Sequence, residues 1–169
     1  MVGFAVCLDA SKLEPPSRAQ AAMKRIHAMC QSTPTSAVDH TDFLPLHNLP
    51  MFISIESKRH GESSDKAELQ LGVWLSAQWK FLASMFGSGP NSHAGGSLGT
   101  ERQQKSLEVM PSILVRGHSW RLMISTLKED GMRRVIYKGV EFGTTQTAVG
   151  VYKLSFGLQW MAGWIENTN

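Results

Sequence analysis

The segment from Pro50 to Lys58 constrains the fold of this chain more than any other part of its sequence. It opens with a proline, continues through the apolar run Met51 to Ile55, and passes directly into Glu56, Ser57 and Lys58. A short apolar run with β-branched residues is typical of a buried strand. Since side chains alternate along a strand, Glu56 and Lys58 should project from one face, their backbones roughly 6–7 Å apart. The segment therefore predicts a buried strand that ends with an acid and a lysine side by side.

Further strands and helices are expected on both sides of this segment. The predicted elements are a strand over 2–8, a helix from Ser17 to about Gln31, an ordered loop from Thr33 to Pro50, a helix from about Ser63 to Phe86, strands over Ser112–Arg116, Ser119–Thr126 and Arg134–Phe142, and a helix from Gln146 to Ile165. Strands that alternate with helices in this order predict an α/β fold with helices around a mixed sheet.

The spacing of apolar residues predicts which side of a long helix packs on the sheet. In the 63–86 helix the expected buried face is Leu69, Val73, Trp74, Ala77, Phe81 and Leu82. The last helix is indicated by its apolar residues Val149, Tyr152, Leu154, Leu158, Met161 and Trp164. Trp74, Trp79, Trp160 and Trp164 occur at helical spacings, which favours core packing over base stacking.

Length and composition indicate one domain with a real core. The chain has 169 residues, 42% of them hydrophobic, which fits a single unit over 1–169 and excludes a disordered tail. Residues 87–99 are rich in Gly, Ser and Asn and predict a flexible loop. Cys7 and Cys30 form neither a disulfide framework nor a C-x-x-C pair, so we expect an intracellular protein, cytoplasmic or nuclear.

Charge and hydropathy narrow the classes of partner. Apolar runs of the roughly 18–20 residues that cross a bilayer are missing, so we expect no membrane partner. A net charge of +3 permits contact with nucleic acid without requiring it. The sequence fixes no oligomeric state.

The pair Glu56 and Lys58 has the chemistry of metal-assisted phosphodiester cleavage. The carboxylate can bind Mg²⁺, and the lysine can position or deprotonate the attacking water. The other reading is an ion pair at a strand end. Gln70 lies near the middle of the following helix, beside residues expected to pack on the sheet.

Histidines and serines give weaker signals. His118, in Gly117-His118-Ser119-Trp120, follows a glycine that would let a ligand approach, although a hydrogen-bonded structural histidine fits the same pattern. Histidine pairs with the spacing of a zinc site are missing from the sequence, and so is the G-x-S-x-G elbow of serine hydrolases.

Together these pieces resemble the PD-(D/E)XK nuclease superfamily, whose E-x-K strand is followed by a helix that offers a glutamine. More narrowly, the chain resembles the fungal PD-(D/E)XK nuclease-like domain family. The matching stretches are Pro50 to Arg59, Leu69 to Trp74, Ala77 to Trp79, Gly117 to Trp120, Gly143 to Thr145, Gly150 to Leu154, and Trp164. The resemblance implies a restriction-endonuclease-like α/β fold and Mg²⁺- or Mn²⁺-dependent nuclease chemistry. It implies Glu56 as metal ligand, Lys58 as the water-activating residue and Gln70 as a residue that orients the pocket.

One departure from the family pattern bears on function. In the family, the strand before the E-x-K strand carries an aspartate in a context that Met1-Val2-Gly3-Phe4 matches, and Gly3 stands at the aspartate position. Loss of one of two metal carboxylates should weaken Mg²⁺ binding. The domain is also short at its N-terminus relative to the family. Asp9 lies roughly 20 Å further along an extended strand, whereas Asp39 and Asp42 precede the E-x-K strand in a loop that could approach it.

Three functions stay open on the sequence. The first is a nuclease whose metal site is impaired by Gly3 or completed by another carboxylate. The second is a nuclease fold repurposed as a metal-independent enzyme on an apolar small molecule, for example in a fungal biosynthetic pathway. The third is a noncatalytic binding module. Fold alone does not choose among them, because function depends on the site.

Overall fold

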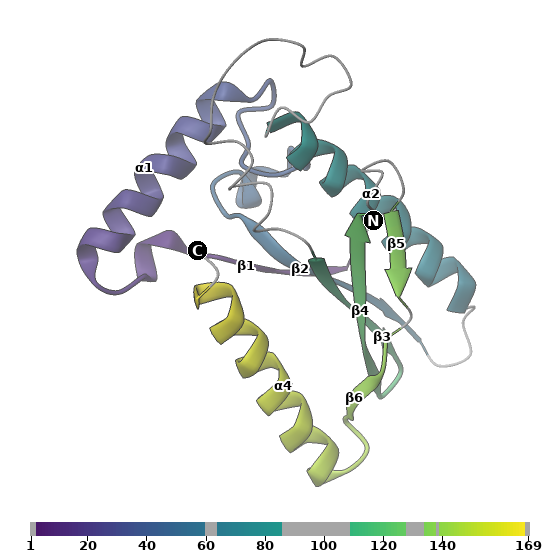
Figure 1. Cartoon of the computed structure of the whole chain (residues 1–169). Coiled ribbons are helices and arrows are strands. Elements are labelled where there is room, and N and C mark those ends of the chain that lie inside the picture. The colour runs from purple at the N-terminus through teal and green to yellow at the C-terminus, as the bar shows by residue number, and fades with distance from the viewer. Residues whose placement is uncertain (1–2, 60–63, 86–108, 128–133, 138, 168–169) are drawn as a thin grey trace.

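The computed structural model of the chain describes residues 3–59, 64–85, 109–127, 134–137 and 139–167. Figure 1 shows their arrangement. The elements are β1 (Phe4–Cys7), the 3₁₀ turn η1 (Ala10–Lys12), α1 (Pro16–Ser32), the 3₁₀ turn η2 (Leu44–Leu46), β2 (Met51–Lys58), α2 (Ser64–Met85), β3 (Val109–Arg116), β4 (Ser119–Leu127), β5 (Arg134–Tyr137), β6 (Glu141–Thr144) and α4 (Ala148–Asn167). The loop expected from Thr33 to Pro50 lies within this part and contains only η2, whereas the loop expected over 87–99 lies outside the described residues.

The strands form one six-stranded mixed sheet in the order β1-β2-β3-β4-β5, and β6 pairs with β4 next to β5. β1 runs antiparallel to β2, β2 runs parallel to β3, and the remaining pairs are antiparallel. The parallel pair is possible because the whole of α2 lies in the chain between β2 and β3. The predicted fold class, a mixed sheet flanked by helices, is confirmed.

Two apolar cores lie on opposite faces of the sheet. On one face, α2 packs on β3 and β4 through a cluster made of Ala67, Leu71, Leu75, Trp79, Met110, Leu114 and Met123. On the other face, α4 packs on β2 and β3 through a cluster made of Ile53, Ile113, Val115, Met161 and Ile165. Odd residues of β2 such as Ile53 therefore face α4, and the even residues Ser54, Glu56 and Lys58 face α2.

The predicted buried face of α2 was partly wrong. Leu69 and Val73 are 68% and 64% exposed, and the helix instead buries Leu71 and Leu75. The helix carries apolar residues on more than one side, so periodicity alone could not choose between two stripes that lie about half a turn apart. The side of α2 that packs on the sheet is the one that also lets Trp74 and Gln78 hydrogen-bond to β2.

The strand predicted over Arg134–Phe142 is two strands, β5 and β6, that pair with different parts of β4. They are separated at Gly139, where a Cβ atom would lie 1.1 Å from the carbonyl oxygen of Leu122. Only glycine allows the backbone to approach β4 this closely, and it does so where the pairing changes from β5 to β6.

The last predicted helix is present as α4, and only some of the apolar residues that indicated it are buried. Leu154 and Met161 are buried, whereas Val149 and Tyr152 are 65% and 76% exposed. The expectation that the tryptophans pack in the core fails for Trp160, which is 63% exposed, and holds for Trp79, which is 4% exposed. Within the described part of the chain, every helix is too short or too polar to cross a lipid bilayer.

Candidate functional site

The acid and the lysine at the end of β2 form a direct ion pair. Lys58 Nζ lies 2.9 Å from Glu56 Oε1, and the two side chains are 19% and 3% exposed. The shared face predicted from the strand period is thereby confirmed. The adjacent lysine ammonium offsets part of the cost of burying the Glu56 carboxylate.

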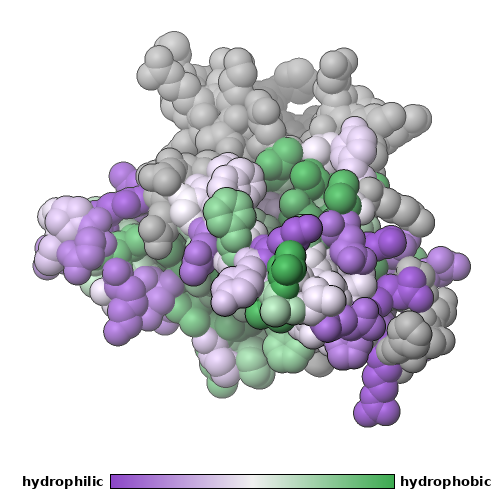
Figure 2. Space-filling model, turned by 90° about the horizontal axis from the view of Figure 1, so that it is seen from below, coloured by the Kyte–Doolittle hydropathy of each residue, from purple (hydrophilic) through white to green (hydrophobic). Residues whose placement is uncertain are grey.

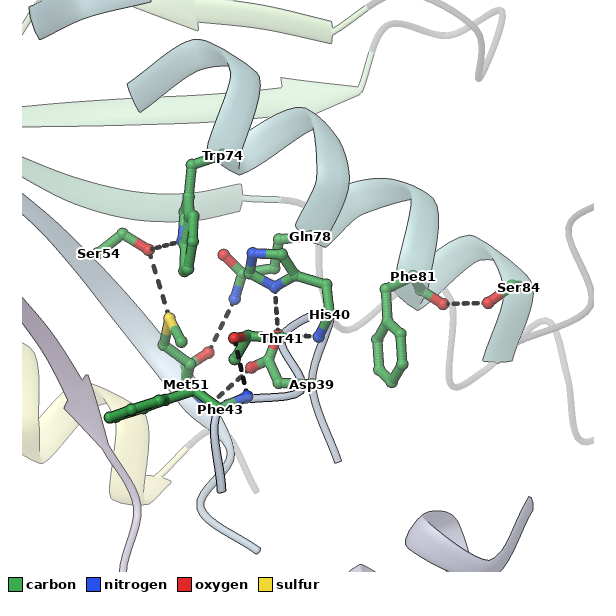
Figure 3. Close-up of polar contacts among 10 residues, drawn as sticks. All are labelled: Asp39, His40, Thr41, Phe43, Met51, Ser54, Trp74, Gln78, Phe81 and Ser84. Carbon is green, nitrogen blue, oxygen red and sulfur yellow. Dashed lines mark hydrogen bonds and ion pairs between the residues drawn. The ribbon is translucent and has the colours of Figure 1, made fainter. Parts of the chain in front are cut away.

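Two hydrogen bonds fix how α2 lies on β2. Gln78 donates from Nε2 to the carbonyl oxygen of Met51 at 3.0 Å, and one turn earlier Trp74 donates from Nε1 to Ser54 Oγ at 3.0 Å. Figure 3 shows both side chains reaching from the helix to the strand. The helix thus runs antiparallel to β2, so that residues earlier in α2 lie over residues later in β2.

The same progression carries Gln70, one turn before Trp74, toward Glu56. Gln70 is half-buried, and its Oε1 atom is buried without a hydrogen-bond partner. Glu56 Oε2 is also buried without a partner. Both atoms are acceptors, so they cannot satisfy each other. An unpartnered buried carboxylate oxygen is costly, and a bound cation or proton donor would remove that cost.

Cationic side chains gather at the edge of the sheet where the parallel strands β2 and β3 end. Lys58 is the register partner of Arg116, and Arg59 follows Lys58. A cavity of about 560 Å³ opens there, lined by Ser57, Lys58, Arg59, Val115 and Gly117. Among the described residues that line it, Lys58 and Arg59 are cationic and none is acidic, so the cavity suits an anionic group.

His118 lies at the same edge, in the turn between β3 and β4. Gly117 adopts φ 56°, which an L side chain rarely takes, and this sharp turn joins the two strands. His118 is exposed, and its Nδ1 atom lies 2.7 Å from Thr145 Oγ1. The turn therefore brings His118 to the end of the sheet that carries Lys58, with one ring nitrogen held by Thr145.

The other carboxylates considered from the sequence do not join Glu56. Asp39 is 5% exposed and sits at the start of β2, where its Oδ2 accepts the N–H of Met51 at 3.0 Å. Met51 and Glu56 are separated by roughly 16 Å of strand. Asp9 caps η1 by accepting the N–H of Ser11. Across the residues that the structure describes, no three His, Cys, Asp or Glu side chains gather in a way that could hold a metal ion.

A second buried polar cluster was missed by sequence reasoning. His40 Nδ1 lies 2.6 Å from Asp39 Oδ1, and the His40 ring meets the Trp74 ring edge-on with centroids 4.5 Å apart. Figure 3 shows this pair beneath α2, next to Met51 and Gln78. An Asp-His dipeptide in a loop does not by itself indicate a buried pair. The folded loop between α1 and β2 brings it under α2.

Gly3 lies just before β1, which pairs Phe4 with Ile55. Continuing this antiparallel ladder by one residue leads to Glu56. A Cβ atom on Gly3 would lie 3.5 Å from Ser57 Oγ and 3.8 Å from the carbonyl oxygen of Ile55, which are ordinary contacts. The backbone therefore accepts a Cβ atom at Gly3 without a clash, and the nearest side chain to it is that of Ser57.

Comparison with known proteins gives the family of the chain. The chain matches the family profile described as the PD-(D/E)XK nuclease superfamily over residues 1–168. The chain belongs to this superfamily. Comparisons with curated proteins and with solved structures gave no match. In this superfamily member, the strand of the E-x-K motif is β2, and the helix that carries the glutamine is α2.

Proposed function

We propose that this superfamily member is a metal-dependent phosphodiesterase acting on nucleic acid, with a metal site reduced to one carboxylate. The single observation that carries the proposal is the pair of buried, unpartnered oxygens, Glu56 Oε2 and Gln70 Oε1. Carboxylate and amide oxygens are ligands of Mg²⁺ and Mn²⁺, and Mg²⁺ is often held by one or two carboxylates with waters and substrate phosphates. The donor set therefore fits a weakly held divalent cation.

A bound Mg²⁺ would supply charge neutralisation at the scissile phosphate and activation of a water molecule. The remaining chemistry belongs to the chain. Glu56 uses Oε1 to hold Lys58 and keeps Oε2 for the cation. The Lys58 ammonium has three donors and gives one to Glu56, so the others can orient a phosphate oxygen or the attacking water.

The surroundings of the pair support an anionic substrate. Arg59 and Arg116 lie at the same strand ends as Lys58, and the adjacent cavity has a cationic lining. A phosphodiester backbone would therefore be drawn to this edge. His118 completes the proposed site: Thr145 engages its Nδ1, which leaves Nε2 for the substrate. The cavity favours an anionic ligand over the apolar small molecule that the sequence left open.

The same surplus of positive charge favours a second candidate function, a noncatalytic module that binds nucleic acid. Gly3 at the proposed aspartate position would then mark the loss of cleavage. The proposal also includes three further points: the chain belongs to the fungal branch of the superfamily, it acts inside the cell, and it uses Mg²⁺ or Mn²⁺. The two candidates differ in whether the cation and Lys58 matter for turnover.

A calorimetric Mn²⁺ titration tests the metal site directly. We expect weak binding by the wild type, no binding by Glu56→Gln, and binding at least about tenfold tighter in Gly3→Asp, because a second carboxylate joins the first. Glu14→Gln is the matched control, since it removes an exposed carboxylate far from β2 in sequence. Wild-type binding that survives Glu56→Gln would show that the cation is held elsewhere.

Cleavage of short labelled DNA and RNA strands then separates the two functions. A phosphodiesterase should cut in Mn²⁺ or Mg²⁺, stop in EDTA, and lose activity in Lys58→Met. A binding module should retain strands in EDTA, lose affinity as salt rises, and never cut. If the chain neither cuts nor retains nucleic acid under any of these conditions, both candidates are wrong.

A further inference from the structure

α4 carries apolar side chains on its solvent face as well as on its packed face. Leu154 and Met161 are buried against the sheet. On the other side lie four large residues, which we call the outer stripe: Val149, Tyr152, Phe156 and Trp160. Their exposed fractions are 65%, 76%, 71% and 63%. Figure 2 looks onto the side of the molecule to which the lower end of α4 points, where green residues lie among white and purple ones.

The outer stripe is continuous along the helix. Its members are spaced by three, four and four residues, which places them on one side of an α-helix over about 16 Å. Between Ala148 and Ile165 the sequence holds one charged residue, Lys153. A helix that faces water normally carries several charges on its outer side. The composition of α4 is therefore that of a helix covered on both faces.

The size of the outer stripe matches the centre of a protein interface. A Phe, Tyr or Trp side chain can bury about 150–250 Å², so the three aromatic residues at these exposures offer about 300–500 Å². Apolar patches of this size mark interaction sites, and a standard interface buries about 800 Å² on each partner. The neighbouring exposed residues Ser155 and Gln159 supply a polar rim.

We propose that two copies of this chain pair through the outer stripe of α4. The four members of the stripe are uncharged, and the one charged residue of the helix, the exposed Lys153, lies at the edge of the same side. The stripe therefore offers little for a charged partner to match, but it is complementary to itself, as a two-fold interface requires. Its smallest residue, Val149, lies at one end and its largest, Trp160, at the other. Antiparallel pairing sets the small end of one copy against the large end of the other, and it also opposes the two helix dipoles favourably.

This pairing is independent of the proposed phosphodiesterase. α4 covers the sheet face of Ile53 and Ile113, whereas Glu56 and Lys58 face α2. Two copies joined through α4 would keep both acid–lysine pairs accessible on their outer sides. The pairing can therefore fail or succeed without regard to whether the site binds a metal.

Sedimentation velocity over a range of protein concentrations tests the pairing. We expect wild type to shift from monomer to dimer in the micromolar range. Phe156→Lys should remain monomeric at every concentration, because it places a charge in the stripe one turn from Lys153. Leu69→Lys is the matched control, since it adds the same charge at a leucine that is 68% exposed on α2, and it should dimerise like wild type.

Circular dichroism establishes that both variants are folded, and Trp160→Lys replaces Phe156→Lys if the latter is not. A wild type that stays monomeric at the highest concentration would overturn the proposal. So would equal loss of dimer in Leu69→Lys and Phe156→Lys. A monomer that floats with neutral lipid vesicles would assign the stripe to a membrane surface and would also overturn it.

Discussion

The two ends of β2 place a buried carboxylate under the same helix, yet they use it differently. At the start, both carboxylate oxygens of Asp39 are hydrogen-bonded. Oδ1 accepts from the backbone N–H and Nδ1 of His40, and Oδ2 accepts from the backbone N–H of Met51. At the end, one oxygen of Glu56 is paired with Lys58, and the other is buried without a hydrogen-bond partner. A carboxylate with both oxygens bonded holds the fold together, whereas one with a free buried oxygen is available for chemistry.

The start of the strand also has buried atoms without hydrogen-bond partners, but none of them belongs to the carboxylate of Asp39. His40 Nε2 and Gln78 Oε1 are buried without partners. These belong to groups whose other polar atoms are engaged with Asp39 and Met51. The unpartnered oxygen of Glu56 belongs to a carboxylate, and leaving a charged group unsatisfied costs more than leaving an amide unsatisfied.

Removing the carboxylate at the start should have the largest effect on stability. Asp39→Ala leaves the Met51 N–H and His40 without their acceptor inside the protein. We expect a loss of about 3–5 kcal/mol in the free energy of unfolding. Glu56→Gln should change that energy by less than about 1 kcal/mol, since the amide can still accept from Lys58 and its N–H₂ can donate to an acceptor. Urea unfolding monitored by Trp fluorescence measures both, and equal losses would abolish the contrast.

An intermediate effect is expected when the lysine at the end is removed. Lys58→Met leaves Glu56 buried without its counter-charge. Because Lys58 is itself partly exposed, we expect a loss of about 2–3 kcal/mol rather than the full cost of a buried pair. The double variant Glu56→Gln/Lys58→Met should regain most of it, because no buried charge remains. Failure of the double variant to recover would mean that Lys58 acts through packing alone.

The smallest effect concerns Cys7, which is the register partner of Met51 and so reports on the start of the strand. Burial, together with the nearby charge of Asp39, raises the pKa of the Cys7 thiol above its usual value. At pH 8 the thiolate fraction is therefore smaller than in a free cysteine, and alkylation should be slow. Asp39→Asn removes the smaller of the two causes, so the pKa should fall and the rate at pH 8 should rise a few-fold. Glu56→Gln, at the far end, should leave the rate unchanged.

Much of the fold could be predicted because local signals agreed with the tertiary structure. The apolar run of β2 and the order of strands and helices indicated the correct elements. The errors have a common cause. α2 and α4 carry apolar residues on more than one side, so their buried faces depended on which residues the sheet could accept. The break between β5 and β6 depended on a close approach to Leu122 that no local pattern encodes.

The candidate site divides in the same way. The spacing of Glu56 and Lys58 placed them on one face of a strand, because the period of two is a property of any extended chain. The position of Gln70 relative to them required the hydrogen bonds from Trp74 and Gln78 that align α2 on β2. Asp39 shows the converse. On the sequence alone, Asp39 could have approached Glu56. In the fold it is hydrogen-bonded to Met51 at the opposite end of β2.

The sequence by itself determined most of the elements, the acid–lysine pair and the glycine before β1, because these follow from the periods of strand and helix and from residue identity. Only the tertiary structure decided which carboxylate keeps a free oxygen and which apolar stripe meets water. Both depend on neighbours distant in the chain: Met51 and His40 occupy the oxygens of Asp39, and the sheet covers Leu154 while leaving Phe156 exposed. Whether a polar atom has a hydrogen-bond partner and whether a side chain is buried depend on tertiary contacts, and these form only when the chain folds.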